Sequence, residues 1–235
     1  MTVYVGTSGF SFPEWRGSFY PDKFPTAKML AYYAERFNTV EINYTFYRVP
    51  TEKLLQGWAQ GTPGQFAFTL KAPRRITHDS KLQNVADLTQ TFCRTAATLG
   101  TKLGVLLFQL PPTLKRNDAV FASFLDTLPE GTRAAFEFRH ESWHDNVILE
   151  TLRRRNLSLC IAESEKTSTP IVQTADYTYS RLRDEGYQSG DIERWASVVR
   201  SHDALQGAYV YFTHEEQGKG PEFAQALMTT LGTGP

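Results

Sequence analysis

Short apolar runs recur along the chain, and in several of them polar or small residues occupy every second position. In the segment 134–139, Phe136 and Phe138 fall on one face of an extended chain, whereas Glu137 and Arg139 fall on the other. Alternation of this kind predicts a strand with two chemically different faces. Comparable segments predict eight strands, at 3–7, 39–43, 66–71, 104–109, 134–139, 158–162, 178–182 and 208–213.

Helical patterns separate most of these segments. Leu30, Tyr33, Ala34 and Phe37 have the spacing of one helix face, and similar stripes follow near residues 88–99 and 121–128. The segment 163–177 has no such stripe, so the helix between the sixth and seventh strands is expected to be reduced or absent. With no linker or composition shift, residues 1–235 are expected to form a single domain, an α/β (β/α)8 TIM barrel. A doubly wound open sheet is the alternative.

The faces of the predicted strands favour the barrel. In most of them one face is large and apolar, as packing against outer helices requires. The other face is small or apolar at the start of the strand and polar at its end, where barrels of this kind hold their active sites. Strands one and six are ambiguous in phase. The side chains expected to converge on the C-terminal mouth are Glu41, Asn43, Lys71, Gln109, Glu137, Arg139, Arg181 and Tyr211.

The overall charge restricts the classes of partner. The chain has 25 basic and 25 acidic residues, so it has no net attraction to nucleic acid or to an anionic membrane. Its two cysteines do not form a disulfide framework and fit a reducing compartment. The first residues enter a strand directly, and no apolar run approaches the length of a membrane span. A soluble, cytoplasmic protein is expected, and its oligomeric state cannot be predicted from the sequence.

Several longer phrases resemble one family. They are GTSGFSFPEWRGSFYP (6–21), EINYTFYRVP (41–50), FTLKAPRRITH (68–78), GVLLFQLPP (104–112), FEFRHESW (136–143) and YVYFTH (209–214). They are similar to motifs of the YecE-like family, domain of unknown function 72, across nearly the whole chain. The resemblance implies a TIM barrel and leaves the activity open. Three departures from the family's pattern are Tyr44 at a position where a small residue is usual, RLRDEG at 181–186 without a histidine, and Thr213-His214 in place of an Asn-Asn pair.

The charges at the predicted mouth favour a small anionic partner, phosphorylated or carboxylated. Lys71, Arg139, Arg181 and Arg183 outnumber the two acids, and arginine forks match carboxylate and phosphate. In this interpretation Arg139 and Arg181 clamp the anion and Lys71 assists. The alternative is an ionic network that only plugs the barrel, in which every charge must be paired.

The two acids suggest the chemistry. Glu41 and Glu137 are predicted to act as acid/base catalysts of a hydrolase or lyase, and glycoside hydrolysis would also use two carboxyls. A non-catalytic anion-binding protein is one alternative. A metal-dependent phosphoesterase acting on nucleic acid, with His78, His140 or His214 as ligands, is another, although no tight ligand spacing is present. Neither GxGxxG nor GxxxxGK[ST] occurs, so there is no dinucleotide or Walker fingerprint. The cofactor is left unknown, and no metal ligand is assigned.

Overall fold

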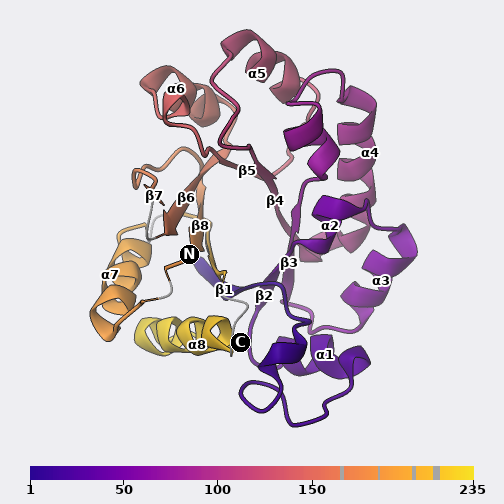
Figure 1. Ribbon diagram of the computed structural model, residues 1–235, viewed down its shortest axis with the longest axis vertical. Coiled ribbons are helices and arrows are strands. Elements are labelled where there is room, and N and C mark those ends of the chain that lie inside the picture. Colours follow the sequence, from indigo (N-terminus) through magenta and orange to yellow (C-terminus); the bar gives the residue numbers. More distant parts are fainter. Residues whose placement is uncertain (165–166, 185, 203–204, 214–217) are drawn as a thin grey trace.

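Eight parallel strands close into a barrel, and helices lie around its outside (Figure 1). The computed structural model describes residues 1–164, 167–184, 186–202, 205–213 and 218–235. The barrel strands are β1 (Thr2–Ser8), β2 (Thr39–Ile42), β3 (Ala67–Lys71), β4 (Leu103–Gln109), β5 (Ala134–Glu137), β6 (Ser158–Ser164), β8 (Tyr177–Leu182) and β9 (Gly207–Phe212). The eight predicted strands are confirmed, with ends that differ by one or two residues.

The order of the strands distinguishes a barrel from an open sheet. β1 pairs in parallel with both β2 and β9, and β5 pairs with β6, so the ring has no free edge. The TIM-barrel prediction is therefore confirmed. Where β1 approaches β2, a Cβ on Gly6 would lie 2.1 Å from the carbonyl oxygen of Thr39, so only glycine fits there.

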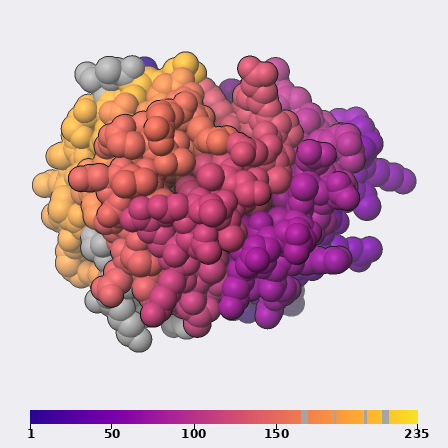
Figure 2. Space-filling model, turned by 90° about the horizontal axis from the view of Figure 1, so that it is seen from above, coloured from indigo at the N-terminus to yellow at the C-terminus, as the bar shows by residue number. Residues whose placement is uncertain are grey.

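The helices follow the strands in chain order. The α-helices are α1 (Met29–Ala34), α2 (Tyr44–Tyr47), α3 (Glu52–Gln60), α4 (Ala86–Ala96), α5 (Asp118–Leu125), α6 (Asn146–Arg154), α7 (Ser189–Arg200) and α8 (Lys219–Leu231). Shorter 3-10 turns lie at Pro13–Trp15, Thr26–Lys28, Ala97–Lys102 and Glu141–Trp143, and a π-helical turn lies at Arg75–Asp79. Figure 2, a view onto the side of the barrel, shows the chain passing from purple on one side through magenta and orange to yellow on the other.

The segment between β6 and β8 differs from the other connections. A two-residue strand, β7 (Thr167–Ser168), turns back and pairs antiparallel with the end of β6. Within the described part of this connection there is no helix, as the missing apolar stripe at 163–177 predicts. None of the described helices is long and apolar enough to cross a membrane.

The two faces of each strand enter different clusters, as their alternation predicts. The outward face packs against the helices through large apolar side chains, such as Phe108 and Phe136, whose ring centroids are 5.3 Å apart. The inward face holds small side chains and tyrosines in a separate cluster. The structure also resolves the two ambiguous strands: Val5 of β1 and Leu159 of β6 face outward, and Cys160 faces inward.

Tyrosines fill the interior of the barrel below its mouth. Tyr4 and Tyr209 stack with their ring centroids 4.6 Å apart, and the Tyr177 hydroxyl donates to the carbonyl oxygen of Ala134. Tyr211 and Tyr179 lie between this pair and the mouth, and both are completely buried. The interior is therefore a packed aromatic floor, here defined as Tyr4, Tyr177, Tyr179, Tyr209 and Tyr211.

Candidate active site at the barrel mouth

A buried arginine joins two carboxylates at the C-terminal ends of the strands. The Arg181 guanidinium donates to Glu41 from Nε (3.0 Å to Oε2) and from Nη2 (2.9 Å to Oε1). Its Nη1 donates to Glu137 Oε2 at 2.6 Å. All three side chains are almost completely buried, so the ion pairs are shielded from water. Arg181, Glu41 and Glu137 are called the ionic core below.

Neutral and charged neighbours complete the hydrogen bonding of the ionic core. Glu41 accepts hydrogen bonds from the hydroxyls of Ser8 and Tyr179. Glu137 accepts from Gln109 Nε2 at 2.8 Å and from Arg139 Nε at 2.8 Å. Each carboxylate oxygen thus has at least one donor, which is what burial of a charge requires.

The pKa of the Glu137 carboxyl reflects the balance of these contacts. Burial alone would raise it, but the Arg181 and Arg139 guanidinium groups and the Gln109 amide hold this pKa well below its usual range. Burial lowers the pKa of Arg181, and the two carboxylates more than reverse that effect. Glu137 is therefore ionised throughout the physiological range, and it can serve as a base or as a fixed negative charge but not as an acid.

A pocket of about 320 Å³ opens directly above the ionic core, and we call it the mouth pocket. Four of its lining residues are cations, and none is an acid. The residues that line the mouth pocket are Ser8, Asn43, Phe46, Tyr47, Lys71, Gln109, Arg139, Arg181, Arg183 and Thr213. A larger side pocket of about 630 Å³ shares Arg139 and Arg183 with it and is bordered by Glu137, Phe138 and Ala162.

Lys71 and Arg183 are the cations of the mouth pocket that have no counter-ion among the described residues. In the part of the chain that the structure describes, neither forms a salt bridge, whereas Arg139 and Arg181 both do. The Lys71 ammonium lies 4.3 Å from the centroid of the Phe46 ring. Burial, followed by repulsion from Arg181, lowers the pKa of Lys71 to about 8. Burial and the same neighbouring arginine lower the pKa of Arg183.

The reactivity of Lys71 should reveal this shift. In competitive labelling with acetic anhydride, we expect Lys71 to become reactive with a midpoint near pH 8, whereas a lysine in an unstructured model peptide has a pKa of about 10.4. The protein and the model peptide are labelled together at each pH, and peptide mass spectrometry then gives the reactivity profiles of Lys71 and of the peptide lysine under identical conditions. Coincident profiles for Lys71 and the peptide would contradict the assignment.

The structure brings most of the predicted site residues together. Lys71, Gln109, Arg139 and Arg181 line the mouth pocket, and Glu41 and Glu137 lie directly beneath or beside it. Asn43 also lines it. Its Nδ2 donates to Ser8 Oγ at 2.7 Å, and its buried Oδ1 has no hydrogen-bond partner among the residues that the structure describes.

Tyr211, also predicted at the mouth, does not line the mouth pocket. Its hydroxyl lies 2.7 Å from Thr39 Oγ1 and 2.8 Å from Thr69 Oγ1, within the aromatic floor. Tyr211 is therefore one layer too deep to touch a ligand in the mouth pocket.

Sequence patterns did not identify several residues of the site. Ser8 was missed because the phase of the first strand is ambiguous. Tyr179 lies two residues before Arg181 on the same face of β8, so strict alternation would have placed it there.

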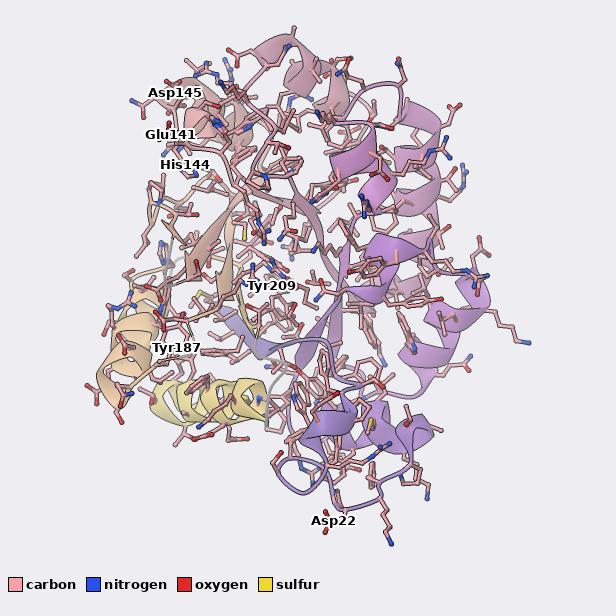
Figure 3. All side chains as sticks on the ribbon, in the orientation of Figure 1. Asp22, Glu141, His144, Asp145, Tyr187 and Tyr209 are labelled. Atoms are coloured by element: carbon pink, nitrogen blue, oxygen red, sulfur yellow. The ribbon has the colours of Figure 1, made fainter. Side chains whose placement is uncertain are left out.

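His78 and His140, two of the three predicted metal ligands, have separate local contacts. His78 Nδ1 lies 2.8 Å from Thr77 Oγ1, and His140 Nδ1 accepts from the Ser142 amide at 3.1 Å. In Figure 3, Glu141 and His144 lie near α6, away from Tyr209 inside the barrel. Across the described residues, no three His, Cys, Asp or Glu side chains come together as a metal site. The predicted ligand His214 lies outside the described residues.

The sequence departures have different positions. Arg183, in the segment that lacks the usual histidine, lines the mouth pocket, and so does Thr213. Tyr44 is 49% exposed on α2 and does not line the mouth pocket. Among the departures within the described residues, those at Arg183 and Thr213 thus change the surface that a ligand would meet.

Solved structures share this architecture. A crystal structure of a DUF72 family protein from Thermotoga maritima matches with a TM-score of 0.87 and 25% identity, covering 99% of this chain and all of that one. A DUF72 family protein from Enterococcus faecalis matches with a TM-score of 0.83 at 18% identity, covering 100% of this chain and 97% of that one, which supports the fold alone.

The match to a curated relative is partial. UPF0759 protein YecE of Escherichia coli (strain K12) is 28% identical over 168 residues, which are 69% of this chain and 59% of that protein. The match thus spans less than two thirds of that protein's length. A family model described as "Protein of unknown function DUF72" matches residues 4–235. The chain with this cationic mouth above a buried Glu-Arg-Glu core therefore belongs to the DUF72 family.

Proposed function

We propose that the protein is an enzyme that binds a small anionic molecule, phosphorylated or carboxylated, in the mouth pocket. The observation that carries this proposal is the lining of that pocket, which includes Lys71, Arg139, Arg181 and Arg183 but no acid. Guanidinium groups offer paired donors to carboxylate and phosphate oxygens, and an ammonium adds a compact charge.

The electrostatics of the mouth pocket support anion binding. Lys71 and Arg183 have no salt-bridge partner among the described residues, and both have a lowered pKa. Their positive charges are therefore destabilised where they stand. A bound anion would reduce that repulsion, which makes the free energy of binding more favourable.

The carboxylates supply the proposed chemistry. Glu137 borders the side pocket and is held ionised, so it acts as the base on a substrate that extends from the mouth pocket into the side pocket. Glu41 is completely buried and fixes the orientation of Arg181. Proton abstraction by Glu137 is consistent with a lyase, and activation of water by the same group is consistent with a hydrolase.

A non-catalytic anion-binding protein is the second candidate, because both oxygens of Glu41 and of Glu137 already accept hydrogen bonds. In that case the two acids serve only to hold the arginines. Glu137→Gln keeps the shape and removes the base, so it separates the two functions once a ligand is known. Turnover reduced by about 100-fold or more supports the enzyme, whereas tight binding without turnover in the natural protein supports the second candidate.

Thermal unfolding with added anions tests the proposal directly. We expect millimolar phosphate, sulfate or citrate to raise the melting temperature, while potassium chloride at matched ionic strength does not. A protein that responds to none of these anions more than to chloride would contradict anion binding at the mouth.

The pH dependence of this stabilisation follows from Lys71. Its folded-state pKa is about 8, so its charge is present below that pH and is lost as the pH rises through it. Sulfate keeps one charge state over this range, and we therefore expect the sulfate-induced shift to be larger at about pH 7 than at about pH 9. Between these values, sulfate binding should be accompanied by proton uptake. Titration calorimetry in buffers of different ionisation enthalpy measures it, and a shift that is equal or larger at the higher pH would reject the role of Lys71.

A further inference from the structure

The amine of Lys71 differs from every other cation in the mouth pocket. The three arginines can hold an anion, but a guanidinium stays protonated in proteins and does not act as a nucleophile. Lys71 has a primary amine that lines the same pocket and rests over the Phe46 ring. Its Nζ forms no hydrogen bond or salt bridge with any part of the chain that the structure describes, so nothing there has to be broken before it reacts.

Lys102 shows what a structural lysine looks like in this fold. Its amine donates to the Ala59 carbonyl oxygen at 2.5 Å, to the Thr62 carbonyl oxygen at 2.7 Å and to Thr62 Oγ1 at 3.1 Å. Those bonds use all three ammonium protons and tie the end of α3 to the start of β4. Lys71, in contrast, has its stem half-buried at the end of β3 and its amine facing the pocket.

We propose that Lys71 is a nucleophile that forms an imine with the carbonyl group of an anionic oxo compound, either a 2-oxo acid or a phosphorylated aldehyde or ketone. This inference rests on the proposed function, because the anionic group is held by Arg139 and Arg183 while the carbonyl carbon meets Lys71. The lowered pKa supports it, since a substantial share of the amine is neutral near pH 8.

The reaction balances without a cofactor. The neutral amine attacks the carbonyl carbon; a C–N bond forms, the C–O π bond breaks, and the oxygen takes up a proton. The nitrogen lone pair then expels this oxygen as water after a second proton transfer, which leaves a protonated imine. In total, the ammonium form and the carbonyl compound give the iminium and one water molecule.

The iminium carries the same single positive charge as the ammonium form of Lys71, so the reaction adds no charge to the pocket. Glu41 and Glu137 attract a positive charge at Lys71 and offset part of its destabilisation by burial and by Arg181. The Phe46 ring face provides a further favourable contact for a cation. The acids of the ionic core thus acquire a role that needs no change in their protonation.

Reductive trapping tests the proposal. The natural protein is incubated near pH 8 with sodium cyanoborohydride and either pyruvate or dihydroxyacetone phosphate, followed by peptide mass spectrometry. We expect a single reduced adduct on Lys71, formed with the compound whose anion the pocket prefers. Adduct formed with pyruvate identifies the 2-oxo acid class, and adduct formed with dihydroxyacetone phosphate identifies the phosphorylated class.

Two variants control the experiment. Lys71→Arg keeps a cation but removes the nucleophile, so the adduct should fall by about tenfold or more while the phosphate-induced rise in melting temperature is retained. Lys53→Arg, at an exposed position on α3, should change neither.

The outcomes separate this inference from the function it rests on. Two outcomes combine stabilisation by phosphate with an adduct that is either absent from Lys71 or spread evenly over surface lysines. Either result rejects Lys71 as a nucleophile but is consistent with anion binding at the mouth. Adduct yield unchanged in Lys71→Arg also overturns it. Loss of both the adduct and the phosphate response in the natural protein overturns both proposals.

Discussion

Replacing Arg181 with methionine is expected to lower the free energy of unfolding by about 3–5 kcal/mol, the largest effect of any single change at the mouth. The substitution keeps a long side chain but leaves Glu41 and Glu137 as two buried carboxylates without their shared counter-ion. Urea unfolding followed by circular dichroism measures the loss.

Arg183→Met is the matched control. It removes the same charge from the same pocket, but Arg183 has no salt bridge in the described residues, so the change should stay within about 0.5 kcal/mol. Equal losses in the two variants would contradict the assignment of Arg181 as the centre of the ionic core.

The pH dependence of the Arg181→Met deficit has a predictable sign. The Glu137 carboxyl has a pKa below its ordinary value in the fold, so its contribution to stability is present above the unfolded pKa of about 4.3 and is lost as the pH falls further. Protonation of Glu137 also removes the unpaired buried charge that destabilises the Arg181→Met variant. The difference between the two proteins should therefore be greatest at neutral pH and shrink in acid.

The double variant Lys71→Met with Arg183→Met is expected to weaken phosphate binding by about 100-fold or more. Each hydrogen bond to a charged group contributes about 1.5–3 kcal/mol, and about 1.4 kcal/mol corresponds to tenfold in affinity. The fold should be unharmed, because both side chains are cations that neighbouring arginines repel. Isothermal titration calorimetry at constant ionic strength gives the two affinities.

A control for the loss of a surface cation lies outside the pocket. Lys71 is the last residue of β3, and Arg74 lies three residues later. The Arg74 Nε pairs with Asp79 at 3.0 Å on the exposed surface. Arg74→Met should alter the affinity by no more than about twofold. Comparable losses in both proteins would mean that phosphate responds to the overall charge of the molecule and not to the mouth pocket.

The alternation of residues was sufficient to predict which way most side chains face. Glu137 between Phe136 and Phe138, and Glu41 between Val40 and Ile42, have only one orientation that buries the large apolar groups against helices. The shape of the barrel then forces the polar residues at the strand ends toward a common centre.

The pairing inside that centre could not be predicted in the same way. Arg181 lies 140 residues from Glu41 and 44 from Glu137 along the chain, and its contacts depend on the closure of the ring between β6, β8 and β9. Alternation gives the direction of a side chain but not its depth. Tyr211 shows this limit, because its direction was correct while its hydroxyl ends in the layer below the pocket.

The aromatic floor closes the barrel interior below the mouth, so the interior opens at the mouth. Tyr4, Tyr177 and Tyr209 occupy the interior at the far end, and Tyr179 and Tyr211 close the space just beneath the two acids. Solvent and protons therefore exchange with Glu41 and Glu137 from the mouth side. A ligand bound above Arg181 would separate Glu41 and Glu137 from bulk water. While it is bound, the charge interactions around these two carboxylates would be stronger.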